Sequence, residues 1–418
     1  MEIEYRAADG VRALVDGLGR TEDIRFSPGN RRLAMVGFNA GRVVVLDVEI
    51  ARTSQSIDVA VTAGVEIASP SLRYPHGADF IDDETLAVAN RLGDLVIFKL
   101  PSAGTGACEL SPIQVIAPPG GSRSHAPGSV TALRRADARC ELLVCDNEGH
   151  SVTRHLIDQA ADCRVVSSDV LLRKWVNLPD GICVSRDRRW IAISNHNTHG
   201  ILLYDWSSPL GAQAAAAGIL RGVRYPHGIR FSTDGRYIFV ADAGAPLVHI
   251  YAHGGEGWRG AWSPAASIRI KDEQLFLRSR GNPQEGGPKG IDIDSGMNVL
   301  VATSEHQPLL FLDVRAMLAE VRLPSPALDA EYEAVILEHA ESTRNRVVRA
   351  EARAAAADKR AAAAEAMAAC QERRAEKFKA KAARAKAKAR AARMQAALDS
   401  LVVGRPFARL YAAFKRPT

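Results

Sequence analysis

The sequence lacks the features that would assign it to a membrane, secreted or nucleotide-binding class. It has no apolar run of roughly 18 residues, the length that a membrane-spanning helix needs. Residues 1–10, MEIEYRAADG, lack the basic start and apolar stretch of a secretory signal. The 6 cysteines form no CxxC pair, and P-loop, GxGxxG, GxSxG and HExxH motifs are absent. We therefore expect a cytoplasmic protein without a disulfide framework or a nucleotide-binding loop.

The chain does contain a phrase of eight residues that occurs twice. RYPHGADF occupies 73–80 and RYPHGIRF occupies 224–231, which places His76 and His227 151 residues apart. That spacing is three times a looser period of about fifty residues between 20 and 315, and such periods mark repeat architectures. With 47% hydrophobic and 24% charged residues among 418, the chain can bury a large core.

Each copy of the period contains short apolar runs bounded by Gly, Pro, Asn or Asp, which predict three strands and a fainter fourth. The copies lie at 24–48, 78–100, 130–156, 182–206, 229–251 and 291–314. Four-stranded units of this length form the blades of propellers, so we predict an all-β six-bladed β-propeller over residues 1–322. We expect an N-terminal strand from 1–18 to close the last blade, since an open blade would expose strand edges.

Polar residues recur just before the first strand of each copy. These positions are Glu22, His76, Thr131, Asp180, His227 and Lys289. In a six-bladed ring, copies three apart face each other across the channel, so His76 is expected opposite His227. By the same rule Glu22 lies opposite Asp180, and Thr131 lies opposite Lys289. A second set of polar residues follows the middle strands, namely Asn90, Asp146, Asn195, Asp242 and the 303–306 loop.

The residue types in these rings allow three uses. Two imidazoles and two carboxylates can bind a divalent transition metal, or can divide acid and base roles between groups of unlike pKa. A lysine in the ring can hold an anionic ligand or lower the pKa of a carboxyl group. Alternatively, Asp, His and Asn beside Gly bond to nearby backbone and recur for structural reasons. The candidate metal ligands are Glu22, His76, Asp180 and His227. The candidate ligand-binding residues are these four with Lys289, Asn90, Asn195 and Asp242.

The segments LPDGICV and YPHGIRFSTDGRYIFVADAG resemble those of known propellers over about residues 20–315. The pattern is similar to the gluconolactonase and senescence-marker propellers, and to NHL-repeat and phosphogluconolactonase-like propellers. The first resemblance implies lactone hydrolysis and a calcium-like metal held by a Glu of the first blade, asparagines of middle blades and the Asp of a PDG motif. Glu22 and Asp180 match the outer members of that set. At the place of the family's asparagine-glycine motif this chain has PHG with His227, which follows Asp180 in the sequence.

The chain changes character after the last copy. Residues 327–401 contain no Gly or Pro and are rich in Ala, Glu, Lys and Arg, which predicts a long helix over 323–403. Its apolar positions are nearly all Ala between 348 and 394, so a strong leucine-zipper seam is absent. A coiled coil, a strut in a bundle and a solvated single helix all remain open. Residues 404–418 form a short amphipathic basic tail.

Charge is concentrated in this second part. Residues 350–418 hold 17 Lys and Arg against 6 Asp and Glu. Segment 377–393, KFKAKAARAKAKARAAR, contains no acidic residue. A run of this kind attracts nucleic acid, an anionic membrane surface or another polyanion, so we expect such a partner at 377–418. The helix itself is expected to bind a protein partner or a second copy of the chain.

The sequence thus favours a non-catalytic binding or scaffolding protein. Its channel face would hold a small-molecule ligand or a partner, and its basic helical tail would serve oligomerisation or peripheral attachment to an anionic surface. One alternative is a metal-dependent lactonase-type hydrolase acting at the channel mouth. A second is nucleic-acid binding through the tail. We expect no cofactor other than a divalent metal in the channel.

Overall fold

The computed structural model describes residues 1–54, 56–102, 104, 106–121, 125–255, 257–280, 284–322, 384 and 386–396. The chain divides into two units, 1–346 and 347–418. Of the second unit, the described residues are helical and exposed. The rest of the predicted long helix and the basic tail lie outside the described residues. Within the described part, no helix combines the length and the apolar character needed to cross a membrane.

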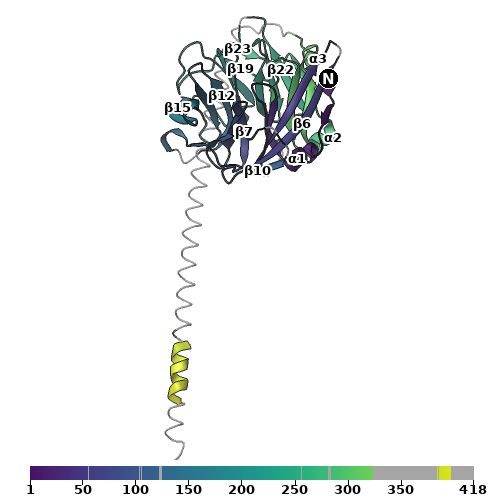
Figure 1. Cartoon of the computed structure of the whole chain (residues 1–418). Coiled ribbons are helices and arrows are strands. Elements are labelled where there is room, and N and C mark those ends of the chain that lie inside the picture. Colours follow the sequence, from purple (N-terminus) through teal and green to yellow (C-terminus); the bar gives the residue numbers. More distant parts are fainter. Residues whose placement is uncertain are drawn as a thin grey trace, which may run out of the picture. The chain divides into compact units, whose positions relative to one another are not determined.

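Six antiparallel sheets follow one another along the chain, which confirms the six-bladed propeller (Figure 1). Blade one contains β3 (Thr21–Phe26), β4 (Arg32–Gly37), β5 (Arg42–Arg52) and β6 (Ile57–Ala68), with β2 (Tyr5–Ala7) and β10 (Gly106–Glu109) added parallel to β6. Blade two contains β7 (Pro75–Asp82), β8 (Thr85–Asn90), β9 (Leu95–Lys99) and β11 (Gln114–Ile116). Blade three contains β12 (Pro127–Arg134), β13 (Arg139–Asp146), β14 (Ser151–Asp158) and β15 (Arg164–Leu172).

The last three blades repeat this order. Blade four contains β16 (Pro179–Val184), β17 (Trp190–Asn195), β18 (Gly200–Asp205) and β19 (Gly218–Leu220), with β23 (Gly260–Trp262) added parallel to β19. Blade five contains β20 (Pro226–Phe231), β21 (Tyr237–Asp242), β22 (Leu247–Ala252) and β24 (Ala266–Arg269). Blade six contains β25 (Ile291–Ile293), β26 (Val299–Ser304), β27 (Gln307–Asp313) and, from the N-terminus, β1 (Glu2–Ile3). Short helices are α1 (Val11–Gly17), α2 (Glu273–Arg278), α3 (Val314–Leu318), η1 (Pro119–Gly121), η2 (Gln159–Ala161) and η3 (His196–Thr198).

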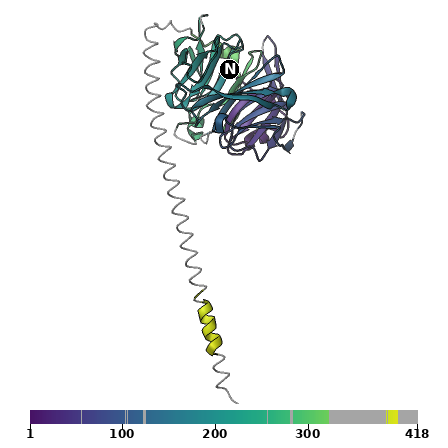
Figure 2. The ribbon, with the colours of Figure 1, turned by 90° about the vertical axis from the view of Figure 1, so that its left-hand side faces the viewer.

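The sheets close into a ring. Each first strand packs beside the first strand of the next blade, and β25 packs against β3. Figure 2 shows the early purple blades and the later teal blades as neighbouring sheets. The N-terminal strand closes the last blade as predicted, because β1 pairs antiparallel with β27, with Glu2 opposite Leu312 and Ile3 opposite Phe311. The closure leaves β27 hydrogen-bonded on both sides.

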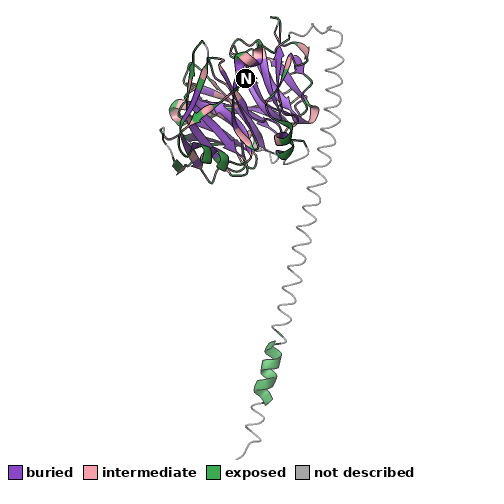
Figure 3. Ribbon diagram, turned by 90° about the vertical axis from the view of Figure 1, so that its right-hand side faces the viewer, coloured by how far each residue is buried: buried purple, intermediate pink, exposed green. Residues whose placement is uncertain are grey.

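Apolar side chains fill the space between neighbouring blades. The buried aliphatic and aromatic residues form six clusters, and each cluster joins two adjacent sheets. The middle strands β4, β8, β17 and β26 are buried at every position, because each sheet is covered on both faces by its neighbours (Figure 3). This packing holds the first strands, and the polar residues at their starts, in fixed positions around the channel.

Glycine follows the channel residue in four of the six first strands because adjacent blades come too close there for a side chain. A Cβ on Gly181 would lie 1.9 Å from the carbonyl oxygen of His227. A Cβ on Gly228 would lie 2.7 Å from the carbonyl oxygen of Lys289. The recurring HG, DG and KG pairs therefore combine a channel side chain with a point of contact between blades.

Candidate metal centre

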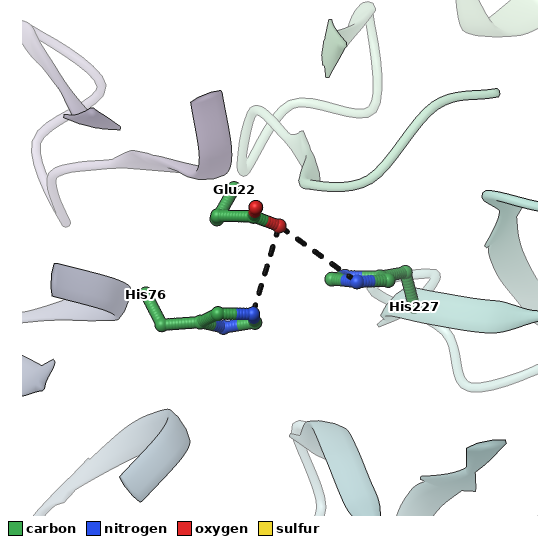
Figure 4. A group of neighbouring side chains, drawn as sticks. All are labelled: Glu22, His76 and His227. Carbon is green, nitrogen blue, oxygen red and sulfur yellow. Dashed lines mark ion pairs between the residues drawn. The ribbon is translucent and has the colours of Figure 1, made fainter. Parts of the chain in front are cut away.

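Five predicted channel residues lie together in one buried cluster at the starts of the first strands. They are Glu22, His76, Asp180, His227 and Lys289, and none of their side chains is more than 6% exposed. The rings of His76 and His227 stack with their centroids 5.5 Å apart, as the six-bladed ring predicts. Figure 4 shows these two imidazoles and the Glu22 carboxylate pointing toward one another from three different blades.

The expected position of Thr131 opposite Lys289 is wrong. In blade three, Val130 pairs with Val144 as Ile182 pairs with Ile193 in blade four. That register places Gly128, two residues before Val130, at the point that His76 and Asp180 occupy in their own strands. Thr131 lies three residues further along β12, and Gly128 contributes no side chain.

The guanidinium of Arg91 fills the space that Gly128 leaves. A Cβ on Gly128 would lie 3.0 Å from Arg91 Nη1. Arg91 Nη2 donates to Nε2 of His76 at 2.8 Å and to Oδ1 of Asp180 at 2.7 Å. Its side chain is 19% exposed, so it lies between solvent and the deeper cluster. The repeat pattern does not point to Arg91, whose only signal in the sequence is its place directly after Asn90.

The hydrogen bonds of His76 fix its tautomer. Nδ1 is 2.8 Å from the carbonyl oxygen of Gly128, which only accepts, so Nδ1 carries the proton. Nε2 is therefore the unprotonated nitrogen, and its single lone pair accepts from Arg91. Burial, followed by the charge of Arg91, lowers the pKa of His76 to about 4. His76 is thus a neutral imidazole whose Nε2 can become a ligand atom once Arg91 releases it.

His227 is held by a carboxylate. Its Nδ1 lies 2.9 Å from Oδ2 of Asp180, which leaves Nε2 facing Glu22. Burial lowers the pKa of His227, but Asp180 and Glu22 together raise it by more, so the net pKa is raised. Burial also opposes ionisation of Asp180, yet His227 and His76 bring its pKa well below the usual value. A histidine bonded through Nδ1 to a carboxylate, with Nε2 free, is the arrangement of many metal-binding histidines.

The two oxygens of Glu22 have different surroundings. Oε1 accepts from Lys289 Nζ at 2.8 Å and from Arg20 Nε. Oε2 is buried and has no hydrogen-bond partner among the residues the structure describes. Burial alone would raise the pKa of Glu22, but Lys289, His76 and Arg20 bring it below its usual range, so the carboxylate is ionised. A buried, ionised oxygen without a donor needs an explanation, and a metal ligand is one.

Three ligand atoms converge on one small space. Glu22 Oε2 lies 3.6 Å from His76 Nε2 and 3.9 Å from His227 Nε2, and the three atoms all lie within 4.8 Å of one another. Ligand atoms around a metal at about 2.1 Å stand about 3 to 4 Å apart. The three ligands help to line a channel space of about 10 Å³, enough for one water molecule or one metal ion, that Asp180, Arg25 and the first-strand glycines also line. The arrangement therefore offers a site for a single metal ion with two nitrogen ligands and one oxygen ligand.

His196 adds a further imidazole beside Asp180. Its Nε2 lies 3.5 Å from Asp180 Oδ2, and its ring stacks on Tyr225 with centroids 4.1 Å apart. Burial lowers the pKa of His196 to about 3. Asp180, His196 and His227 form a second group of close ligand atoms, but His227 belongs to both groups. The Nδ1 atom of His227 is bonded to Asp180. Asp180 and His196 therefore support the first group from outside and are not additional ligands.

The side chains of the second predicted ring form hydrogen bonds with nearby backbone amides and do not join this cluster. Asn90 accepts from the amide of Arg73, and Asn195 accepts from the amide of Asn177. Asp242 accepts from the amides of Arg224, Tyr225 and Gly244. Each therefore fixes the segment that leads into the first strand of its own blade. None of these three lines the space between Glu22, His76 and His227.

The calcium-like metal implied by the gluconolactonase resemblance does not fit these residues. Calcium takes six to eight oxygen ligands. Here Asn90 and Asn195 are engaged with backbone, and Asp180 is turned to Arg91 and His227. Two imidazole nitrogens and one carboxylate oxygen are a ligand set for zinc, iron or another first-row transition metal instead.

Comparison with protein-family models and with curated proteins finds no match. Solved structures with the same kind of fold are similar to this chain. The periplasmic gluconolactonase PpgL of Pseudomonas aeruginosa is 14% identical, with 70% of this chain and 80% of that one covered and a TM-score of 0.45. The β-propeller domain of Cps50 (Swd1) from Myceliophteria thermophila is 12% identical, with 70% and 82% covered and a TM-score of 0.44. A Bacteroides fragilis protein provisionally assigned as a 6-phosphogluconolactonase is 11% identical, with 70% and 79% covered and a TM-score of 0.43. These likenesses carry no argument about function.

Proposed function

We propose that this chain is a ligand-binding propeller that holds one divalent transition-metal ion at its channel mouth. Glu22, His76 and His227 are the ligands. One observation supports the proposal above the others. In each ligand one polar atom points into the shared space, and the other polar atom is bonded to a partner. Gly128 holds His76, Asp180 holds His227, and Lys289 holds Glu22. Such outer partners orient metal ligands and set their tautomers.

The competing explanation is a purely structural polar cluster. Arg91 already donates to His76 Nε2, so metal binding requires Arg91 to give up that bond and keep its bond to Asp180. The exchange is favourable when a metal–nitrogen bond replaces one hydrogen bond. A structural cluster does not account for Oε2 of Glu22, which is buried without a donor among the described residues.

The experiment is a metal titration of the full-length protein after treatment with a chelator. We expect one equivalent of Zn²⁺ or Co²⁺ to bind, with Ca²⁺ unable to compete. His76→Gln and His227→Gln should each weaken Co²⁺ binding by roughly 100-fold, as measured by calorimetry and by the visible absorption of Co²⁺. The matched control is His199→Asn, because His199 is an exposed histidine in the same part of the fold and Asn tolerates its positive φ of 52°.

Absence of stoichiometric uptake, or equal losses in the control and in the two channel variants, would refute the metal site. Tight binding of Ca²⁺ at the same site would instead restore the oxygen-ligand model.

A hydrolytic activity is the second candidate function. Three protein ligands leave at least one coordination position open, which is the difference between catalytic and structural zinc sites. The water-sized space beside the ligands supports this candidate. The metal would supply Lewis-acid chemistry, and lactones or esters are the natural substrates to test. The same variants serve the assay, since metal uptake without turnover leaves ligand binding as the function.

A further inference from the structure

We propose that the metal-loaded site takes an organic carboxylate, bound by Arg91 and Arg20, with its apolar body against Phe38 and Tyr74. This inference rests on the proposed metal site and names the class of ligand it would take. The observations behind it are the charge balance of the cluster, the position of the two guanidiniums and the aromatic residues at the mouth.

The charges of the cluster are already balanced without a metal. Three carboxylates, Glu22, Asp180 and Glu285, face three permanent cations, Arg20, Arg91 and Lys289. Lys289 Nζ lies 2.7 Å from Glu285 Oε2, and Arg20 Nη2 lies 3.1 Å from the same oxygen. A dication that enters this balanced cluster therefore adds uncompensated positive charge in a buried place. An anion at the open coordination position removes that cost.

The two arginines are more accessible to an incoming anion than the metal ligands are. Arg91 is 19% exposed and Arg20 is 22% exposed, whereas the metal ligands beneath them are nearly inaccessible. Nη1 of Arg91 is buried and has no hydrogen-bond partner in the described part of the chain. When His76 Nε2 turns to a metal, Nη2 also loses one acceptor. A carboxylate matches the fork geometry of a guanidinium and would satisfy both nitrogens.

An aromatic wall lies beside these arginines. Phe38 and Tyr74 have ring centroids 5.1 Å apart, and Phe38 lies edge-on to His76 at 5.8 Å. The guanidinium of Arg20 lies 5.0 Å from the centroid of Phe38. Tyr74 is 45% exposed and has a φ of 53°, an unfavourable backbone conformation for a residue with a side chain. Its carbonyl accepts from the amide of Arg91, so the strained residue also positions the anion-binding arginine.

The aromatic wall sets the expected ligand apart from a small inorganic anion. Stacking or packing on Phe38 and Tyr74 stabilises a flat or apolar body, while the arginines bind the carboxylate. Benzoate is the simplest probe with both parts. Acetate keeps only the charge, and benzamide keeps only the ring with a neutral head of the same shape.

The test is titration of the Co²⁺-loaded full chain, followed by the visible absorption of Co²⁺ and by calorimetry. We expect saturable binding of benzoate, weaker binding of acetate by roughly 10-fold, and no binding of benzamide. At saturating Co²⁺, Arg91→Gln should lose benzoate affinity by roughly 30-fold. Tyr74→Ala, at an exposed position, should lose affinity for benzoate but not for acetate. Arg269→Gln, a change of an exposed arginine on β24, is the control.

The outcomes separate the two proposals. If the chain takes up no Co²⁺, the metal site fails and this inference fails with it. If Co²⁺ binds but benzamide binds as well as benzoate, or Arg91→Gln binds benzoate as the parent does, this inference alone is wrong. Equal affinity for inorganic phosphate and benzoate, unchanged by Tyr74→Ala, would likewise contradict an organic carboxylate.

Discussion

Below the metal-ligand cluster, the channel contains a layer of buried carboxyl groups that fasten neighbouring blades together. Asp79 Oδ2 in blade two accepts from the amide of Ala132 in blade three at 2.8 Å. Asp292 Oδ2 in blade six accepts from the amide of Phe26 in blade one at 2.7 Å. The buried guanidinium of Arg25 lies among these carboxyl groups. In both blades a buried aspartate thus accepts a hydrogen bond from a backbone amide of the neighbouring blade.

The stability of the propeller should depend on pH through Asp79. Burial raises the pKa of Asp79 to about 6, against the opposing charge of Arg25. In the unfolded chain the pKa is near 3.8, so folding takes up a proton between these values and stability falls as pH rises from about 4 to 6. The loss from this one group is about 3 kcal/mol at most.

Asp79→Asn removes the titrating carboxyl group. The free energy of unfolding of the variant should therefore fall by about 3 kcal/mol less between pH 4 and pH 7 than that of the parent. The measurement is urea unfolding of both proteins at pH 4 and pH 7. Parallel pH profiles for the parent and the variant would contradict the raised pKa, whatever the absolute cost of the substitution.

At the level of single residues, the sequence could predict which first-strand positions face the channel, because their spacing follows the repeat. It could not predict Arg91, since nothing in the repeat shows that its guanidinium reaches the place of Gly128. Blade three has Pro127 before its glycine instead of a polar residue, so the sequence pattern points to Thr131 in its place. The irregularity in the pairing of β12 between Pro127 and Ser129 is a property of the strand pair rather than of either sequence alone.

At the level of strands, the glycines of the first strands determine how closely the blades approach the axis. Gly181 in β16 is the tightest of those four positions, since a Cβ there would meet the His227 carbonyl at 1.9 Å. The neighbouring strand must move to admit even a methyl group. Because that strand carries His227, the movement would also displace a proposed metal ligand.

Gly181→Ala should therefore cost about 2 kcal/mol or more of folding free energy and weaken Co²⁺ binding at the same time. The control is Gly211→Ala, where a Cβ would meet no atom within 4 Å, with an expected change within about 0.5 kcal/mol. Thermal unfolding measures the change in stability, and a Co²⁺ titration measures the change in metal affinity. A Gly181→Ala protein as stable as the control would show that the blades are not in tight contact at the axis.

The three inner strands of each blade could be predicted from sequence, because their apolar runs are buried on both faces. The outer strands were less clear, and the structure shows why. β11 and β19 have 3 residues each, and β15 has five exposed positions out of 9. A strand of 3 residues is too short to show a period, and a strand that is exposed at most positions has a weak apolar pattern.

For the whole molecule, the number of blades decides the chemistry of the channel. Six blades place the first strands of blades two and five opposite each other, which is how two distant copies of one motif bring their imidazoles within stacking distance. A ring of any odd number would separate them. The separation of 151 residues along the chain was enough to predict this.

The last prediction concerns the positive charge of the second unit. The described helical residues there are exposed, and the prediction that the basic segment binds a polyanion remains a proposal. Full-length protein should bind duplex DNA, heparin or anionic vesicles with an affinity that falls steeply with salt. Replacing four exposed cations by Gln should lower the salt slope for DNA by up to about 4 units, and the four are Lys386, Lys388, Arg390 and Arg393.

The matched control replaces four exposed propeller arginines, namely Arg12, Arg52, Arg139 and Arg269. Loss of binding in the control but not in the tail variant would place the polyanion site on the propeller. Equal affinity for heparin and DNA would leave simple electrostatics as the explanation.

The pairing of β1 with β27 also limits how early during synthesis the last blade can be completed. Ile3 is made before Phe311 and cannot pair with it until about three hundred further residues have been made. At roughly 5 to 20 residues per second, that delay is about 15 to 60 seconds. The last blade therefore closes only after residues about three hundred positions apart have both been synthesised.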